Sequence, residues 1–177
     1  MPRRRQRSAI FAADFETICR MKREQITVDY CVLEAQELSL GEKELVEAAR
    51  AALCGSHADY SGYRVGAAVR LAGGRIVKGS NQENASSPCG ICAERTALFY
   101  AQAEYPGERI EALAVATAGD GEPVSPCGLC RQALAEAEER QGTDIKLLLA
   151  GQSNIYIIGS AAALLPLGFG KKNLGER

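Results

Sequence analysis

Residues 89–95 read Cys89-Gly-Ile-Cys92-Ala-Glu94-Arg95, and residues 126–131 read Pro126-Cys127-Gly-Leu-Cys130-Arg131. The two stretches offer thiols at the spacing of metal ligands, and a carboxylate follows two residues after one of those thiols. A metal site that only holds a fold together does not need this glutamate, whereas a zinc ion that activates water needs a proton acceptor beside it. The pattern therefore favours a catalytic zinc site.

Helices are expected to begin at both cysteine clusters. Apolar residues recur at helical spacing after Cys92, and a second helical stretch runs from Cys127 to about Arg140, where Gly142 ends it. Cys127 and Cys130 are three residues apart at a helix start, so their side chains lie on neighbouring positions of one face. The positive end of a helix also favours thiolate over thiol. These features predict a three-thiolate zinc site with one vacant position.

The rest of the chain predicts an α/β domain. A capping box of Ser39 and Glu42 precedes a helix over about 40–54. Residues 26–32 alternate as an added edge strand does, and further strands are expected at 65–71, from 76, at 110–118, 145–149 and 155–158, before a short helix at 161–165. The strand at 110–118 brings both cysteine-bearing helix starts to one end of the sheet. We expect a three-layer α/β/α sandwich with a mixed central sheet.

Length and charge limit the possible classes of protein. The chain has 177 residues, 46% of them hydrophobic, which suits one buried core but is short for two. A net charge of -1 offers no general attraction to nucleic acid. We expect a mobile tail over 1–20, an extension with the added strand over 21–38, and a catalytic domain over 39–177.

Cysteine usage and the amino-terminal residues predict a cytoplasmic protein. The chain has seven cysteines, an odd number, and three of them are expected to bind zinc. This usage favours a reducing compartment over a disulfide framework. Asp14 and Glu16 interrupt the early apolar run and so count against a signal peptide. No stretch approaches the roughly 20 apolar residues of a membrane span.

Two other uses of the cysteines stay open from spacing alone. Cys89 and Cys92 form a second C-x-x-C pair, so four thiolates could close a purely structural zinc site. A redox dithiol is a weaker alternative, because disulfide exchange needs neither two such pairs nor the adjoining arginines. If Cys89→Ser removed zinc as completely as Cys127→Ser, the catalytic interpretation would be wrong.

Five segments resemble, in order, the signatures of cytidine deaminase, of the short, homotetrameric, zinc-dependent type. The match spans about residues 39–170 and rests on Tyr60-Ser-Gly-Tyr-Arg-Val-Gly-Ala-Ala68, Gly79-Ser-Asn-Gln-Glu-Asn-Ala-Ser86, Cys92-Ala-Glu-Arg-Thr-Ala97, Ser125-Pro-Cys-Gly-Leu-Cys-Arg-Gln132 and Leu164-Leu-Pro-Leu-Gly-Phe-Gly170. The resemblance implies hydrolytic deamination of free cytidine and deoxycytidine to uridine and deoxyuridine in pyrimidine salvage, by attack of hydroxide formed at zinc on C4. Ammonia is the second product.

Site residues follow from the same resemblance by motif position. It implies one zinc ion per subunit on Cys92, Cys127 and Cys130, with Glu94 as the proton shuttle. It also implies a substrate site in which Asn81 and Glu83 bind ribose, Tyr63 and Phe169 line the pyrimidine pocket, and Ala93 contacts substrate. Phe169 is expected to reach the site of a neighbouring subunit. Ser87 stands where the family often has tyrosine, which puts subunit contacts there in doubt.

Two arginines directly follow the ligand motifs. Three thiolates leave excess negative charge on zinc and make it a poorer Lewis acid. Hydrogen bonds from the Arg95 and Arg131 guanidinium groups to sulfur would withdraw that charge. Surface arginines without this role are the alternative.

Three other functions compete with nucleoside deamination as explanations of these motifs. A zinc-stabilised binding module would need the fourth thiolate and would tolerate loss of Glu94. A polynucleotide deaminase would need a basic groove, which the net charge does not suggest. A deaminase of a cytosine-containing antibiotic such as blasticidin S has similar zinc motifs, but Asn81 with Glu83 favours a free ribose.

Overall fold

A computed structural model describes residues 24–119 and 121–175, so the expected tail over 1–20 lies outside the described residues. Its centre is a six-stranded sheet in the order β1-β6-β5-β4-β2-β3. Strands β4 and β5 pair in parallel and all other neighbours pair antiparallel, so the sheet is mixed. The strands are β1 Cys31–Glu34, β2 Val65–Leu71, β3 Ile76–Ser80, β4 Ile110–Thr117, β5 Lys146–Ala150 and β6 Asn154–Ile158.

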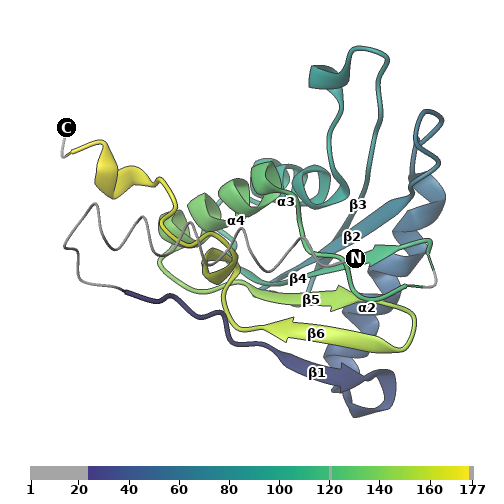
Figure 1. Cartoon of the computed structure of the whole chain (residues 1–177), viewed down its shortest axis with the longest axis horizontal. Coiled ribbons are helices and arrows are strands. Elements are labelled where there is room, and N and C mark those ends of the chain that lie inside the picture. Colours follow the sequence, from purple (N-terminus) through teal and green to yellow (C-terminus); the bar gives the residue numbers. More distant parts are fainter. Residues whose placement is uncertain (1–23, 120, 176–177) are drawn as a thin grey trace, which may run out of the picture.

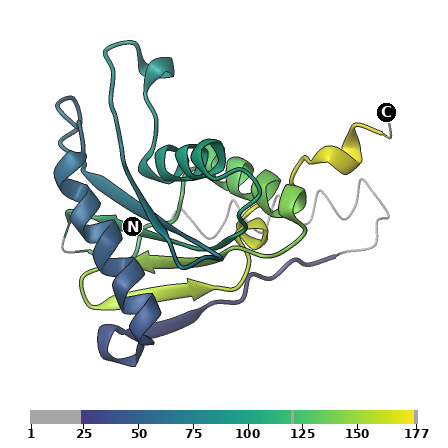
Figure 2. The same cartoon turned by 180° about the vertical axis from the view of Figure 1, so that it is seen from behind.

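Helices cover both faces of this sheet (Figure 1). Helix α2 (Leu40–Ala52) packs on one face, and α3 (Ala93–Glu104) and α4 (Gly128–Gln141) lie on the other, as the reverse view in Figure 2 also shows. Each face has its own buried apolar cluster. Short 3-10 helices occupy Ala35–Glu37, Leu53–Gly55, Ser87–Cys89, Ala161–Leu164 and Lys171–Asn173. The predicted three-layer α/β/α sandwich is confirmed.

The added edge strand exists but is shorter than its sequence pattern predicts. Alternation begins at Ile26, yet pairing with β6 covers only Cys31–Glu34, from Cys31 opposite Ile157 to Glu34 opposite Asn154. The reason is the length of the partner, because β6 ends at Ile158 and offers no ladder to earlier residues. An alternating pattern forms a strand only where a neighbouring strand can accept its hydrogen bonds. The division into an extension over 21–38 and a domain over 39–177 stays a prediction.

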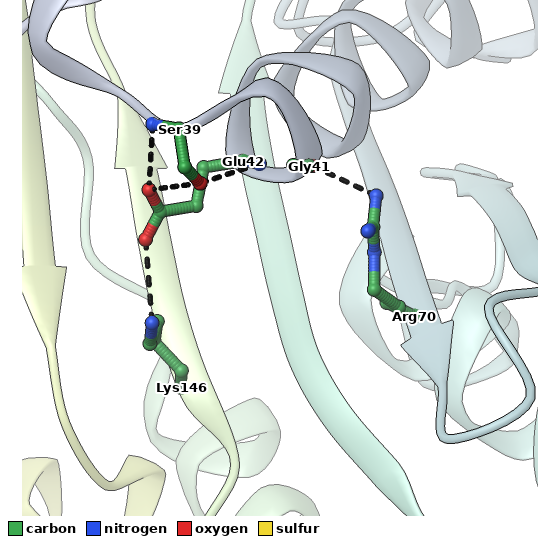
Figure 3. A network of polar contacts seen from close by, with 5 residues as sticks. All are labelled: Ser39, Gly41, Glu42, Arg70 and Lys146. Atoms are coloured by element: carbon green, nitrogen blue, oxygen red, sulfur yellow. Dashed lines mark hydrogen bonds and ion pairs between the residues drawn. The ribbon is translucent and has the colours of Figure 1, made fainter.

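Helix α2 is fixed at its start by the predicted capping box (Figure 3). The Glu42 backbone N–H donates to Ser39 Oγ at 3.3 Å, and the Ser39 backbone N–H donates to Glu42 Oε2 at 3.0 Å. Lys146 on β5 donates to the same carboxylate, and Arg70 on β2 donates to the Gly41 carbonyl at 2.7 Å. The cap thus joins α2 to two strands of the sheet.

Two glycines allow the helices to approach the sheet closely. A side chain at Gly66 on β2 would collide with the Ala49 carbonyl of α2. A side chain at Gly79 on β3 would collide with the Ala97 nitrogen of α3 and lie 2.7 Å from the Ala93 carbonyl. The position of α3, which carries part of the cysteine site, therefore depends on the missing side chain of Gly79.

Across residues 24–119 and 121–175, no helix combines the length and apolar character that crossing a bilayer requires.

Candidate zinc site

Three cysteine sulfurs meet where α3 and α4 begin. Cys92 is the N-cap of α3, Cys127 is the N-cap of α4, and Cys130 lies in the first turn of α4. The Cys92 and Cys127 sulfurs are 3.7 Å apart, those of Cys127 and Cys130 are 3.5 Å apart, and all three lie within 4.8 Å of one another. A tetrahedral zinc with Zn–S bonds of about 2.3 Å requires sulfurs about 3.8 Å apart. The predicted ligands therefore fit one zinc ion.

Cys89 lies outside this cluster. It is exposed at the end of the 3-10 helix Ser87–Cys89, which sits on a loop that extends beyond β3 in Figures 1 and 2. Within the described ranges, the group of side chains at metal-ligand distances contains Cys92, Cys127 and Cys130. Among the described residues no fourth sulfur joins these three, which is the arrangement of an open catalytic site rather than a closed structural one.

The surroundings of the cysteines favour the thiolate form of Cys92. A hydrogen bond from the Cys130 thiol, with further ones from Arg95 and Cys127, lowers the pKa of Cys92 to about 5 against the opposing effect of burial. The pKa of Cys130 is raised, because its proton is shared with the Cys92 sulfur and because it is buried. Thiolate is the form that binds zinc.

Glu94 is the second residue of α3 and is only 4% exposed. Burial is the main cause that raises the pKa of its carboxyl group, and the neighbouring Cys92 sulfur raises it further. A buried carboxyl group with a raised pKa can both accept and return a proton, as general acid-base catalysis requires. The predicted proton acceptor thus lies directly beside the sulfur cluster.

Arg95 interacts with two of the sulfurs. Burial lowers the pKa of its guanidinium, but interactions with the Cys130 and Cys92 sulfurs outweigh burial and leave the pKa raised. Its Nε is buried and, within the described residues, has no hydrogen-bond partner. These interactions support the predicted role of Arg95 in offsetting thiolate charge.

Arg131 has partners other than sulfur. Its Nε donates to the Pro126 carbonyl at 2.7 Å, and its two terminal nitrogens donate to Ser125 Oγ at 3.0 Å and to the Leu164 carbonyl at 3.2 Å. The guanidinium therefore joins the turn before Cys127 to the 3-10 helix Ala161–Leu164. The sequence predicted that Arg131 would contact the sulfurs because it follows Cys130 directly. In the structure its side chain instead hydrogen-bonds to groups of the neighbouring loops.

Asn81 and Glu83 support the loop before β2. The buried Asn81 amide accepts from the Val65 N–H at 2.8 Å and from Ser56 Oγ, and donates to the Tyr63 carbonyl at 2.9 Å. The Glu83 carboxylate accepts from the Tyr60 and Ser61 N–H groups at 2.9 and 3.1 Å and from Ser61 Oγ. The Ser61 hydroxyl is the main cause of the lowered pKa of Glu83.

Ser56 and Ser61 were not identified from the sequence. Only the folded chain shows which hydroxyls come to lie opposite Asn81 and Glu83, although a buried asparagine in a loop indicates that donors must be near.

The remaining predicted substrate residues lie in different surroundings. Ala93 is fully buried in the first turn of α3, beside the cluster. Tyr63 is exposed on the loop before β2. Phe169 is 59% exposed on the segment that follows α4 and β6, and its carbonyl accepts a hydrogen bond from Gln132.

Comparison with known proteins gives consistent matches. The family model of the cytidine and deoxycytidylate deaminase zinc-binding region matches residues 41–142. A cytidine deaminase of Halalkalibacterium halodurans is 39% identical over 134 residues, which are 75% of this chain and 96% of that protein. A cytidine deaminase of Sporosarcina psychrophila is 37% identical over 128 residues, 67% of this chain and 84% of that protein.

Solved structures agree in fold. The crystal structure of cytidine deaminase from Burkholderia pseudomallei has a TM-score of 0.63 and 41% identity, covering 71% of this chain and 97% of that one. That of cytidine deaminase from Mycobacterium tuberculosis has a TM-score of 0.60 and 32% identity, covering 75% of this chain and 99% of that one. Since the family model spans more than half of the sequence and includes the three clustered cysteines and Glu94, the chain belongs to the cytidine deaminases, a family of zinc-dependent hydrolases.

Proposed function

We propose that this chain hydrolyses free cytidine and deoxycytidine to uridine and deoxyuridine, releasing ammonia. The observation that carries the proposal is the buried Glu94 carboxyl group beside three sulfurs at zinc-ligand distances. A binding module would gain nothing from a buried carboxyl group at this position, since burying an ionisable group costs free energy. Membership of the cytidine deaminase family supports the same reaction.

The metal site would hold one zinc ion per subunit on Cys92, Cys127 and Cys130. When bound there, zinc supplies a nucleophile by lowering the pKa of a water molecule from 15.7 toward about 7. Side chains of the protein transfer the protons and bind the substrate.

Glu94 moves the protons of the reaction. Its carboxylate takes one proton from water and delivers it to N3 of the pyrimidine, while the water oxygen bonds to C4. It then takes the second proton and delivers it to the amino group, which leaves C4 as ammonia. Water thus supplies the new carbonyl oxygen, the N3 hydrogen and the third hydrogen of ammonia, so the reaction balances. The raised pKa of Glu94 suits a group that changes role within one turnover.

Ribose recognition is assigned to Asn81 and Glu83, which lie two residues apart in an extended segment and so point the same way. Both retain hydrogen-bonding capacity. One N–H of the Asn81 amide is used by the Tyr63 carbonyl, and an amide nitrogen carries two. The Glu83 carboxylate accepts three hydrogen bonds, and about four can be accommodated. The loop contacts therefore hold these groups in place while leaving positions for sugar hydroxyls.

A homotetramer with shared active sites is part of the proposal. Leu167 is 93% exposed, and Phe99 and Tyr100 on α3 and Leu129 on α4 are also exposed. The carboxyl-terminal segment that ends with the 3-10 helix Lys171–Asn173 extends from the body of the subunit in Figures 1 and 2. Exposed apolar residues of this number favour burial against other subunits. Phe169 would then line the pyrimidine pocket of a neighbour, together with Tyr63, in an enzyme of cytoplasmic pyrimidine salvage.

Substrate assays test the proposal directly. Purified protein is incubated separately with cytidine, deoxycytidine and blasticidin S, and ammonia release is measured together with bound zinc. We expect release from both nucleosides and one zinc per chain. Release from blasticidin S alone would overturn the nucleoside assignment.

Two cysteine variants test the zinc ligands. Cys127→Ser should lose zinc, whereas Cys89→Ser should keep it because Cys89 is outside the cluster. Equal loss in both variants would contradict the open site.

A further inference from the structure

Helix α4 holds the backbone at Phe169 and directly after it. In the second turn of α4, Gln132 Nε2 donates to the Phe169 carbonyl at 2.8 Å. About two turns further along the same face of α4, the Glu139 carboxylate accepts from the Lys171 and Lys172 N–H groups at 3.1 and 3.4 Å. Hydrogen bonds with side chains of one helix therefore fix the backbone at the aromatic residue and in the two to three residues that follow it.

The residues directly before Phe169 form a largely exposed turn. Leu167 adopts a left-handed conformation with φ of 57°, which is unfavourable for a leucine, and its side chain is 93% exposed. The Gly168 N–H closes a turn on the Leu165 carbonyl at 3.0 Å. The Phe169 ring itself is mostly exposed. Burial of side chains in this subunit therefore does not decide where the ring lies, and the backbone contacts to α4 do.

We infer that Gln132 and Glu139 are positioning residues that set the placement of Phe169 for substrate binding in the neighbouring subunit. The inference rests on the proposed function, in which Phe169 lines the neighbour's pyrimidine pocket. Helix α4 carries Cys130 of its own site in its first turn, contacts Phe169 through Gln132 in its second turn, and contacts the following residues through Glu139. One helix therefore serves two active sites, and loss of Gln132 should damage the neighbour's site rather than its own.

A local role is the competing explanation, because Gln132 is only two residues from Cys130. In that case the variant would disturb zinc binding or the chemical step within the same subunit. The positioning role predicts a change in KM at the neighbouring subunit's site. The local role predicts a change in kcat and zinc content in the subunit that carries the variant.

Single variants address the first difference. Gln132→Met and Glu139→Met remove the polar groups and keep side-chain length, and Glu136→Met is the matched control on the same helix. Glu136 is exposed and makes no hydrogen bond within the described part of the chain. We expect KM for cytidine to rise about fivefold in the first two variants, as for loss of one hydrogen bond. The zinc content and kcat should stay near those of the parent.

Unchanged KM in both Gln132→Met and Glu139→Met, or a fall in kcat that parallels zinc loss, would overturn the inference. Thermal unfolding of each variant identifies a misfolded protein, and Glu139→Met, at an exposed position, carries the test if Gln132→Met does not fold.

Mixed tetramers address the second difference. Chains carrying Glu94→Gln, which keep an intact Phe169 segment, are co-expressed under a second tag with Phe169→Ala or with Gln132→Met chains. Doubly tagged tetramers are isolated, and KM is measured. In both mixtures, an active site with intact Glu94 can receive a correctly placed Phe169 from a neighbouring Glu94→Gln chain. We therefore expect some sites with the parental KM, which tetramers of Phe169→Ala or Gln132→Met chains alone lack.

The two mixtures separate the two proposals. Recovery with Phe169→Ala but not with Gln132→Met would refute the positioning role alone. No recovery with Phe169→Ala would refute the shared active site, and the positioning role with it.

Discussion

At the scale of single residues, Glu94 places a buried carboxyl group beside the cysteine sulfurs. Glu94→Gln keeps the size of the side chain but cannot accept a proton from water. We expect kcat for cytidine to fall by at least about 10²-fold, the lower end of the effect of general acid-base catalysis, while zinc content is unchanged. Steady-state kinetics and metal analysis by mass spectrometry measure both quantities.

Glu104→Gln, at the exposed end of the same helix, is the control for Glu94→Gln and should be fully active. A Glu94→Gln enzyme of normal kcat would refute the proton-shuttle role.

The two arginines after the ligand motifs should behave differently. Arg95 interacts with the Cys92 and Cys130 sulfurs, so Arg95→Gln should lower kcat by a larger factor than it lowers zinc content. Arg131 joins Pro126 to Leu164, so Arg131→Gln should lower stability, zinc content and activity together. Kinetics normalised to bound zinc separates the two patterns. Equal losses of activity and zinc in Arg95→Gln would mean that it only holds the site together.

At the scale of elements, the position of α3 depends on Gly79. A methyl group in Gly79→Ala would meet the Ala93 carbonyl and Ala97 nitrogen, so α3 must shift away from β3. We expect a loss of about 1–3 kcal/mol in the free energy of unfolding, typical of overpacking, with weaker zinc binding because Cys92 moves with α3. Urea unfolding and zinc titration measure these changes. Gly159→Ala is the control, since no atom lies within 4 Å of the added methyl group, and equal losses there would contradict this explanation.

The cap of α2 should make stability depend on pH. The hydrogen bond from Ser39 is the main cause that lowers the pKa of Glu42, against burial, with Lys146 lowering it further. A carboxyl group with a lower pKa in the folded chain stabilises it above the unfolded pKa, near 4.5, and this contribution is lost as pH falls through the folded pKa. Glu42→Gln should therefore cost about 1 kcal/mol at pH 7 and little at an acidic pH well below the folded pKa.

Urea unfolding at both pH values checks this dependence. Glu47→Gln, on an exposed part of α2, should show no comparable change with pH. A pH-independent difference for Glu42→Gln would mean that the charge of Glu42 does not contribute.

At the scale of the whole molecule, a subunit of 18.9 kDa should assemble into a tetramer. Because Phe169 is proposed to complete a neighbour's site, activity per chain should fall when dilution separates the subunits, while bound zinc stays constant. Sedimentation equilibrium together with assays at decreasing protein concentration measures this. A dilute monomer with full activity would contradict the shared site.

Much of the fold could be predicted because its signals are local. Helix starts at Ser39, Cys92 and Cys127, the helix end at Gly142 and the alternating strands each depend on a few neighbouring residues. The end of the added strand could not be predicted in this way, since it depends on where β6 stops.

The sequence by itself determined the three thiols, their spacing on two helix starts and the carboxyl group two residues after Cys92, because covalent spacing and helical geometry bring these groups together within each segment. Only the tertiary structure decided that Cys89 lies apart from the other three sulfurs, that Arg131 binds loop carbonyls, and that α4 holds Phe169. These outcomes join segments far apart in the chain, and such contacts depend on how the helices and loops pack rather than on the order of neighbouring residues.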